Sequence, residues 1–214
     1  MNSTSISRLT ISIAAVVLGF STIALAGPPL VCHAIAIGPA KTLPWVDPNY
    51  HKGDGSYDLT NLTADTLAIL DSNPSVLVRM ETLRRATIYA RQDPQVAKEL
   101  LTRLHARTAS SESSPASALA WFDVGYLTEI YKQWMGDGPN PARGLDGYTW
   151  VKKAIALRGS DPEMEFAAAL IVVLKGSESD RNLHVNNAMA GAKTDPLLAQ
   201  NMTSFFNRQT IAAN

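Results

Sequence analysis

The stretch from Asp161 to Leu174, which reads DPEMEFAAALIVVL, decides the fold class. Pro162 is well tolerated in the first turn of a helix, because its missing N–H would have no intrahelical partner there. Asp161 can accept hydrogen bonds from the free amides of that turn. The residues that follow are apolar on every side, and the alanine run allows another helix to approach closely. The stretch therefore predicts a buried helix with a defined start.

The same pair of a capping residue and a proline precedes other apolar runs along the chain. The further pairs are Asn73-Pro74, Asp93-Pro94, Ser114-Pro115 and Asp195-Pro196. Five such starts predict an all-α protein. We expect helices at 63–70, 74–90, 94–108, 115–135, 148–158, 162–175, 185–192 and 196–206, with 115–135 as the central buried helix. The short connection between 74–90 and 94–108 predicts an antiparallel hairpin.

Two spacings between these helix starts match those of known repeat proteins. Asp161 and Asp195 lie 34 residues apart, the tetratricopeptide period, and Pro74 and Pro115 lie 41 apart, near the HEAT period. Over roughly 62–206 the chain thus resembles helical-hairpin repeat proteins of the TPR/HEAT type. The matching pieces are 84–91 with Asp93-Pro94, and 161–174 with 188–198. This resemblance implies an irregular array of antiparallel helical hairpins, about seven to eight helices, that serves as a binding scaffold rather than an enzyme.

The first 26 residues are typical of a signal peptide. Arg8 precedes an uncharged segment at 9–25, and Ala24-Leu25-Ala26 matches the A-x-A cleavage pattern. The apolar run is shorter than a bilayer-spanning helix requires. We therefore expect a signal peptide at 1–26, an extended Pro/Gly-containing arm at 27–58 and an α-helical repeat-like domain at 59–214. The mature protein should be secreted or periplasmic, with no stable membrane span after cleavage.

The composition excludes several classes of protein. Lys+Arg 19 against Asp+Glu 19 is unlike a globally basic nucleic-acid binder, and 46% hydrophobic residues exclude overall disorder. A single cysteine excludes an intramolecular disulfide framework. The chain has no H-E-x-x-H, G-x-S-x-G or P-loop signature, so we expect no cofactor and binding rather than catalysis. An envelope hydrolase whose carboxylates are placed by the fold alone is an alternative.

Cys32-His33 is the most distinctive short motif. In an oxidising compartment a lone cysteine is a buried thiol, an intermolecular disulfide partner, or a ligand of a metal or of haem. His33 adds a second ligand of the kind copper accepts, and His51 could add a third. A metal or redox protein using Cys32 and His33 is therefore a second alternative.

The aromatic residues cluster in the middle of the chain. They form either the core of the helical array or an aromatic-lined groove for a peptide or glycan, with the loop 136–147 as its rim. The candidate groove residues are Trp121, Tyr126, Tyr131, Trp134, Tyr148 and Trp150.

Positive charge is concentrated between Asn73 and Ala109. The candidate basic patch comprises Arg79, Arg84, Arg85, Arg103 and Arg107. It could bind an anionic partner or support self-association, and charge reversal at all of these except Arg79 should then abolish binding without changing the melting temperature. The alternative is an ordinary solvated face with i, i+4 pairs such as Glu81–Arg85 and Glu99–Arg103.

The arm at 27–58 contains a segment, Leu30 to Ile37, that is too apolar to remain in water. Burying each large apolar side chain is worth about 1.5–3 kcal/mol. We therefore expect this segment to dock onto the helical body or onto a second copy of it. Docking onto its own body would shelter Cys32 as a slowly reactive thiol.

Overall fold

The computed structural model describes residues 30–46, 52–110, 115–136, 138–173, 175 and 177–207. This part of the chain is all-helical and contains no strand, which confirms the predicted fold class. Its eight α-helices are α1 (Leu62–Ser72), α2 (Val76–Ala90), α3 (Pro94–Arg107), α4 (Pro115–Trp134), α5 (Gly147–Arg158), α6 (Pro162–Val172), α7 (Glu178–Ala192) and α8 (Pro196–Met202). Short 3₁₀ turns cover Leu59–Asn61 and Thr108–Ser110, and a π turn at Thr203–Asn207 follows α8.

Three of the capping-residue starts form as predicted. The carboxylates of Asp93, Asp161 and Asp195 each accept a hydrogen bond from a backbone amide in the first turn of the following helix. Ser114 lies outside the described residues. The prediction for Asn73-Pro74 is wrong, because α2 begins two residues later, at Val76.

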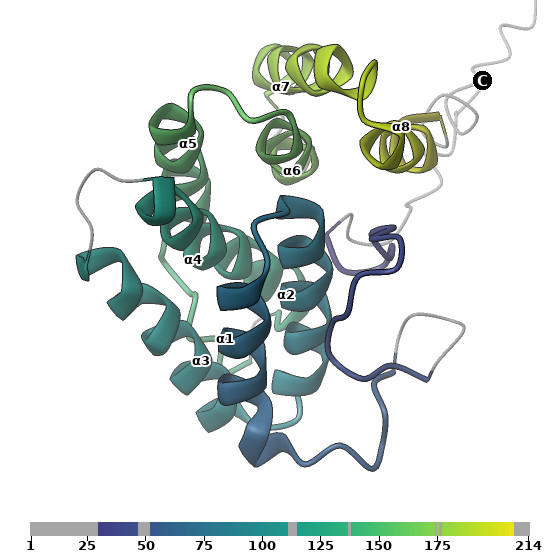
Figure 1. Ribbon diagram of the computed structural model, residues 1–214. Helices are drawn as coiled ribbons and strands as arrows, with labels where there is room; N and C mark the ends of the chain where they lie inside the picture. The colour runs from purple at the N-terminus through teal and green to yellow at the C-terminus, as the bar shows by residue number, and fades with distance from the viewer. Residues whose placement is uncertain are drawn as a thin grey trace, which may run out of the picture.

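The start of α2 is stabilised from a distant part of the chain. Glu163 of α6 accepts hydrogen bonds from the amides of Val76 and Leu77 through Oε2, at 2.6 and 3.2 Å. A negative group at a helix N-terminus also interacts favourably with the helix dipole. The first turn of α6 thereby fixes the N-terminus of α2. Figure 1 shows α6, α7 and α8 gathered beyond this N-terminus.

Two helices form the centre of the body. The described side chains of α4 are buried along most of its length, which agrees with its predicted central place, and α2 is buried on almost every side. Both α2 and α3 pack mainly against α1 and α4 (Figure 1). The close hairpin expected from helices 74–90 and 94–108 is therefore not formed. The closest neighbours are instead α4 with α5 and α6 with α7.

The contact between α4 and α5 depends on glycine. A Cβ atom added at Gly125 would lie 2.7 Å from the carbonyl oxygen of Gly147 and 3.0 Å from the backbone nitrogen of Val151. The backbones of the two helices therefore touch at this point. This close approach holds the start of α5 in place. The first turn of α5 carries Trp150, which lines the candidate site described below.

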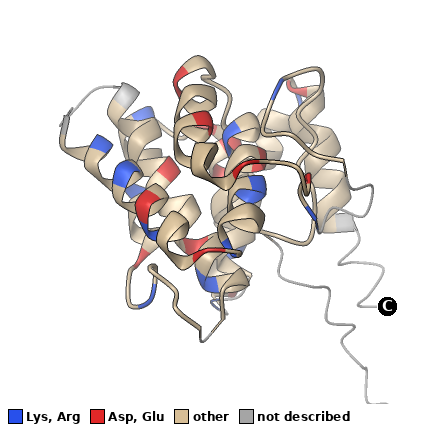
Figure 2. Ribbon diagram, turned by 90° about the horizontal axis from the view of Figure 1, so that it is seen from below, with Lys and Arg blue, Asp and Glu red and all other residues tan. Residues whose placement is uncertain are grey.

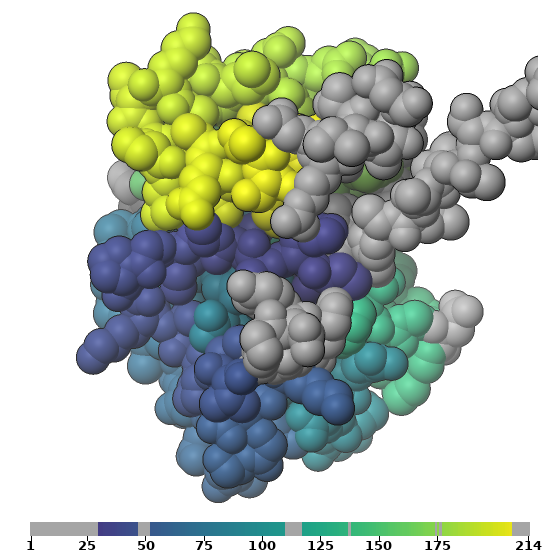
Figure 3. All heavy atoms as spheres, turned by 90° about the vertical axis from the view of Figure 1, so that its right-hand side faces the viewer, coloured from purple at the N-terminus to yellow at the C-terminus, as the bar shows by residue number. Residues whose placement is uncertain are grey.

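The arm docks onto its own helical body, as predicted. Leu30, Val31, Ile35 and Leu43 are buried, and the amide of Ile35 donates to Glu81 of α2 at 3.0 Å. On the other side, the side chain of Asn201 in α8 bonds both backbone groups of Ala36, at 2.8 and 2.9 Å. Figure 3 shows residues 30–46 of the arm as a purple band between the yellow C-terminal segment above and the blue and teal segments below. The arm thus joins the last helix to the centre of the fold.

The predicted signal peptide at 1–26 lies outside the described residues, as do 27–29 and 47–51 of the arm. Among the helices that are described, none combines the length and the apolar character needed to cross a bilayer. Cleavage and export therefore remain predictions from the sequence.

Candidate functional site

The six aromatic residues proposed as a groove do not share one surface. Tyr126 and Tyr131 are fully buried, and Tyr148 is nearly so. Tyr126 stacks on Phe122 with ring centroids 5.4 Å apart, which is ordinary core packing. The three tryptophans are half-buried; Trp121 and Trp150 lie side by side, whereas Trp134 lines a separate hollow. Of the six, only Trp150 lines the hollow that we take as the candidate site.

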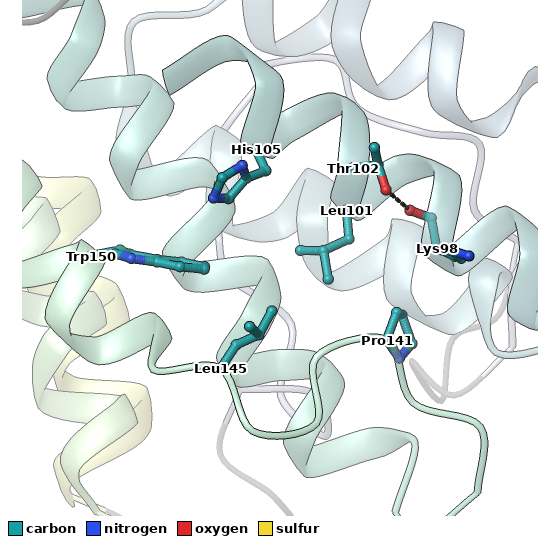
Figure 4. Close-up of a pocket in the computed structure, with 7 residues that line it drawn as sticks. All are labelled: Lys98, Leu101, Thr102, His105, Pro141, Leu145 and Trp150. Atoms are coloured by element: carbon teal, nitrogen blue, oxygen red, sulfur yellow. Dashed lines mark hydrogen bonds between the residues drawn. The ribbon is translucent and has the colours of Figure 1, made fainter. Parts of the chain in front are cut away.

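This hollow, the α3 groove, is a cavity of about 340 Å³ between α3, α5 and the loop that joins α4 to α5. Figure 4 shows Trp150 and Leu145 on the side opposite Leu101 and His105, with Pro141 closing one end. Its lining residues are Lys98, Leu101, Thr102, His105, Pro141, Leu145 and Trp150. Most of the lining is apolar, as is usual for a binding pocket.

The loop wall of the α3 groove is fixed by local hydrogen bonds. The Asn140 side chain donates to the carbonyl of Tyr131 at 2.9 Å and accepts from the amide of Ala142 at 2.9 Å. Asp146 caps α5 by accepting from the amide and hydroxyl of Thr149, at 3.2 and 2.6 Å. Pro141 and Leu145 are therefore carried by a loop whose ends are both held.

Aromatic and cationic groups continue from the groove across α5. The Trp150 ring lies 5.5 Å from the His105 ring and 6.4 Å from the Trp121 ring, measured between centroids. The ammonium of Lys153 is 3.7 Å from the centroid of Trp121, a cation–π contact. Trp150 therefore lies between the ring of His105 and the ring of Trp121, and Lys153 packs on Trp121.

A second hollow of about 370 Å³ adjoins the α3 groove. It is lined by Gln95, Val96, Lys98, Glu99, Thr102 and Arg103, so it shares Lys98 and Thr102 with the groove. The two hollows together extend along α3 from Gln95 to His105, about 15 Å of helix. Such a long surface suits an extended chain better than a compact ligand.

The positive charge of α3 lies along this surface. Lys98 and His105 line the α3 groove, which has no carboxylate among its lining residues, and Glu99 lies in the second hollow with Arg103. Lys98, Arg103 and His105 are all exposed. The groove therefore offers an apolar wall beside the ammonium of Lys98, with the guanidinium of Arg103 in the adjoining hollow.

Trp134 lines a different hollow, of about 470 Å³, with Lys52, Asp54, Tyr57 and Arg91 among its walls. The guanidinium of Arg91 lies 4.8 Å from the centre of the Trp134 ring. One face of this tryptophan is therefore already covered. The Asp54 carboxylate is also engaged, because it accepts bonds from the amide and hydroxyl of Ser56.

The five arginines proposed as a basic patch do not lie on one exposed face. Arg79 and Arg84 are buried, whereas Arg103 is exposed and Arg107 pairs with Asp71. Figure 2 shows blue and red positions interspersed over the helices rather than separated on two faces. Arg84 is therefore not part of an exposed patch, and we expect reversal of its charge to lower the stability.

Arg84 and Arg85 instead hold the arm. Both pair with the buried carboxylate of Glu81, through Nε atoms that are each 2.8 Å from one of its oxygens. Arg84 also donates to the carbonyl of Val31 at 3.1 Å, and Arg85 to the carbonyl of Leu43 at 2.7 Å. The pair Glu81–Arg85 forms as its spacing predicts, but it lies beneath the arm and not on a solvated face.

Arg79 pairs with a second buried carboxylate, that of Asp123 in α4. Its Nη1 lies 2.6 Å from Asp123 Oδ2, and Asp123 Oδ1 has no hydrogen-bond partner among the described residues. Complete burial raises the pKa of Asp123 to about 6, although the charge of Arg79 opposes this shift. The folded protein therefore binds a proton at Asp123 more tightly than the unfolded chain does.

We expect this shift to appear in the pH dependence of stability. Because the pKa of Asp123 rises from 3.8 to about 6 on folding, its favourable contribution is present near pH 4 and is lost as the pH rises through about 6. Compared with Asp123→Asn, the wild type should lose up to about 3 kcal/mol of unfolding free energy between pH 4 and 7. Urea unfolding of both proteins across this range measures the difference, and a relative gain with rising pH would contradict the assignment.

Cys32 and His33 lie in the docked arm. Cys32 is half-buried, and burial raises the pKa of its thiol, an effect that the charge of Arg84 opposes. A raised pKa lowers the fraction of reactive thiolate, in agreement with the sheltered thiol expected for docking onto the same body. The His33 ring packs edge-on against Phe205 with centroids 5.5 Å apart. His51 lies outside the described residues.

The groove was found only in part from the sequence. Trp150 and the loop that carries Pro141 and Leu145 were candidates, but Leu101 and His105 were missed, since each is an ordinary residue of α3. Across the described ranges, no three His, Cys, Asp or Glu side chains gather closely enough to hold a metal ion. Comparison with known proteins found no family model, no curated protein and no solved structure that matches this chain.

Proposed function

We propose that this protein is an exported, non-catalytic helical scaffold that binds an acidic peptide segment of a partner protein in the α3 groove. The observation that carries the proposal is the combination of an apolar wall and cationic groups in one elongated surface. Metal or redox chemistry at Cys32 and His33, and hydrolysis by fold-placed carboxylates, are alternatives that none of the contacts described above favours.

The apolar wall supports an anchor side chain on the partner. Trp150, Leu145 and Leu101 surround a volume suited to one or two large apolar side chains. Aromatic and apolar anchors that fill such pockets contribute most of the energy in many protein interfaces. The held loop and the glycine contact beneath α5 support a site that exists before the partner arrives, which lowers the entropic cost of binding.

The charges support an acidic partner. Lys98 and Arg103 lie along one helix, and Lys153 lies on α5 beside Trp121. Exposed charges of one sign favour a partner of the opposite sign and speed its association. The peptide that fits best therefore carries a large apolar residue with a carboxylate close to it in sequence.

Selection from a displayed library of random peptides tests this proposal. We expect the enriched peptides to combine an aromatic or large aliphatic residue with Asp or Glu. Their affinity, measured by fluorescence anisotropy, should fall at least tenfold in Trp150→Ala and in Lys98→Glu, a loss of about 1.4 kcal/mol or more. It should also weaken with added salt, because exposed charges are screened over about 8–10 Å.

The control is Lys193→Glu, which makes the same change of charge at the end of α7. This variant should bind the selected peptides almost as the wild type does. Equal losses in Lys98→Glu and Lys193→Glu, or peptides with no acidic residues, would show that the α3 groove is not the binding site.

A further inference from the structure

The hollow beside Trp134 is separate from the α3 groove, and we call it the Trp134 hollow. It has a volume of about 470 Å³ and lies where the C-terminal ends of α2 and α4 meet residues 52–57. It shares no lining residue with the α3 groove. Sites for small molecules have volumes of about 300–1,000 Å³. The Trp134 hollow is therefore large enough for a ligand of its own.

The wall formed by residues 52–57 is held against the body of the protein. The amide of Asp54 donates to the Tyr89 hydroxyl at 2.8 Å, and the Tyr57 hydroxyl donates to Asp65 at 2.6 Å. A Cβ atom added at Gly53 would lie 2.3 Å from the Tyr89 ring, so the backbone rests directly on this ring. The wall is thus formed before a ligand arrives, which lowers the entropic cost of binding.

Arg91 brings hydrogen-bond donors to the Trp134 hollow in a fixed orientation. Its guanidinium lies 4.8 Å from the centre of the Trp134 ring, and this cation–π contact restricts the side chain. Within the described part of the chain, the guanidinium of Arg91 pairs with no carboxylate. A stacked guanidinium keeps its N–H groups directed outward in its own plane. Arg91 can therefore donate to a ligand without breaking an ion pair of the protein.

The indole nitrogen of Trp134 is a second donor that the protein leaves unused. Nε1 is withdrawn from solvent and has no hydrogen-bond partner among the described residues. Burying a donor without an acceptor is costly, and most buried polar groups in native proteins have a partner. An oxygen atom of a ligand placed between Arg91 and Trp134 would supply the missing acceptor. This unpaired donor therefore indicates a ligand with oxygen atoms at its surface.

The charged groups around the Trp134 hollow have both signs. Lys52 and Arg91 are cations, and Asp54 is an anion, because hydrogen bonds from Ser56 hold the pKa of its carboxyl below the usual value. The two cations disfavour a cationic ligand, and Asp54 disfavours an anionic one. A metal ion finds too few ligands, since no group of three His, Cys, Asp or Glu forms in the described ranges. The charges therefore favour an uncharged ligand that both donates and accepts hydrogen bonds.

We propose that the Trp134 hollow binds a neutral saccharide. Each sugar hydroxyl both donates and accepts, so Arg91 and Trp134 can donate to it while Asp54 accepts, and the amide of Gln92 can do both. The apolar C–H faces of a sugar ring pack on aromatic side chains, which Tyr57 supplies here. A free sugar and one unit of a glycan chain share this chemistry. The proposal does not depend on peptide binding in the α3 groove.

NMR titration with glucose, galactose, mannose and N-acetylglucosamine, each as the monomer and as short oligomers, tests this proposal. The readout is the indole N–H signal of Trp134, identified by its absence from Trp134→Phe. We expect at least one sugar to shift this signal and to leave the signal of Trp150 in place. Arg91→Ala should lower the affinity at least about tenfold, whereas the control Lys193→Ala should bind as the wild type does. Tighter binding of the oligomers than of the monomers would identify a glycan chain as the ligand.

The charge of Asp54 distinguishes a neutral sugar from other ligands. Asp54→Asn keeps a hydrogen-bonding side chain of the same size, so the sugar affinity should fall less than in Arg91→Ala. Added salt should leave this affinity unchanged, in contrast to that of the acidic peptide expected in the α3 groove. The proposal would be overturned if no sugar shifted the Trp134 signal, if Trp150 shifted equally, or if Arg91→Ala bound as the wild type does. Tighter binding to Asp54→Asn would indicate an anionic ligand and would also overturn it.

Discussion

Replacing Arg84 with methionine is expected to lower the free energy of unfolding by about 3–5 kcal/mol. Arg84 is fully buried, with its Nε 2.8 Å and Nη2 2.9 Å from the two oxygens of Glu81. Methionine fills much of the same space but leaves the buried carboxylate with Arg85 as its remaining cation. Breaking a buried pair costs more than removing it whole, because one charge stays desolvated.

The same substitution should also release the arm. The carbonyl of Val31 loses its bond from Arg84, and Trp45 loses the guanidinium that lies 5.1 Å from its ring centre. We expect Cys32 to react faster with thiol reagents in Arg84→Met than in the wild type. Arg103→Met, an exposed position on α3, is the control and should change stability by less than about 0.5 kcal/mol. A loss below about 1 kcal/mol in Arg84→Met would contradict the role of Arg84 in holding the arm.

Replacing Gly125 with alanine is expected to destabilise the protein by about 3 kcal/mol, although alanine is the better helix former by about 1 kcal/mol. Its Cβ would meet backbone atoms of α5 at 2.7 and 3.0 Å, and backbone atoms cannot rotate away as a side chain can. The two helices must therefore separate. Since this contact holds the start of α5, the α3 groove should widen as well.

The matched control is Gly55→Ala, because a Cβ at Gly55 has no atom within 4 Å. This variant should be neutral or slightly stabilising, since alanine restricts the unfolded chain. Thermal unfolding of the three proteins measures the difference. Equal melting temperatures for Gly125→Ala and the wild type would show that α4 and α5 are not in backbone contact.

The helices were predictable because their signals are local. Asp161 and Pro162 define the start of α6 from within one turn, and the apolar sequence of α4 predicts burial whatever its neighbours are. The start of α2 was not predictable in this way. Its first turn is capped by Glu163, which lies 87 positions after Val76 in the sequence. The local sequence therefore indicated Asn73 and Pro74 as the start.

The chemistry of the arginines and of the groove depends on contacts between distant segments. Glu81 and Arg84 have the spacing of a surface pair, and packing by the arm and by α4 makes them a buried one. The α3 groove likewise combines α3, a loop and α5. Trp150 could be found because it belongs to a cluster of aromatic residues in the sequence, whereas Leu101 differs in no way from a core leucine until its neighbours are known.

The arm between α2 and α8 also sets the order of events during synthesis. Ala36 bonds Asn201, 165 residues later, so the first described segment cannot reach its final place until the last helix has left the ribosome. Contacts between such distant positions slow folding, because a long loop must close before they form. Until then α2 and its buried charges face water on the side that the arm will cover. The nascent chain is thus prevented from completing its core by its own topology.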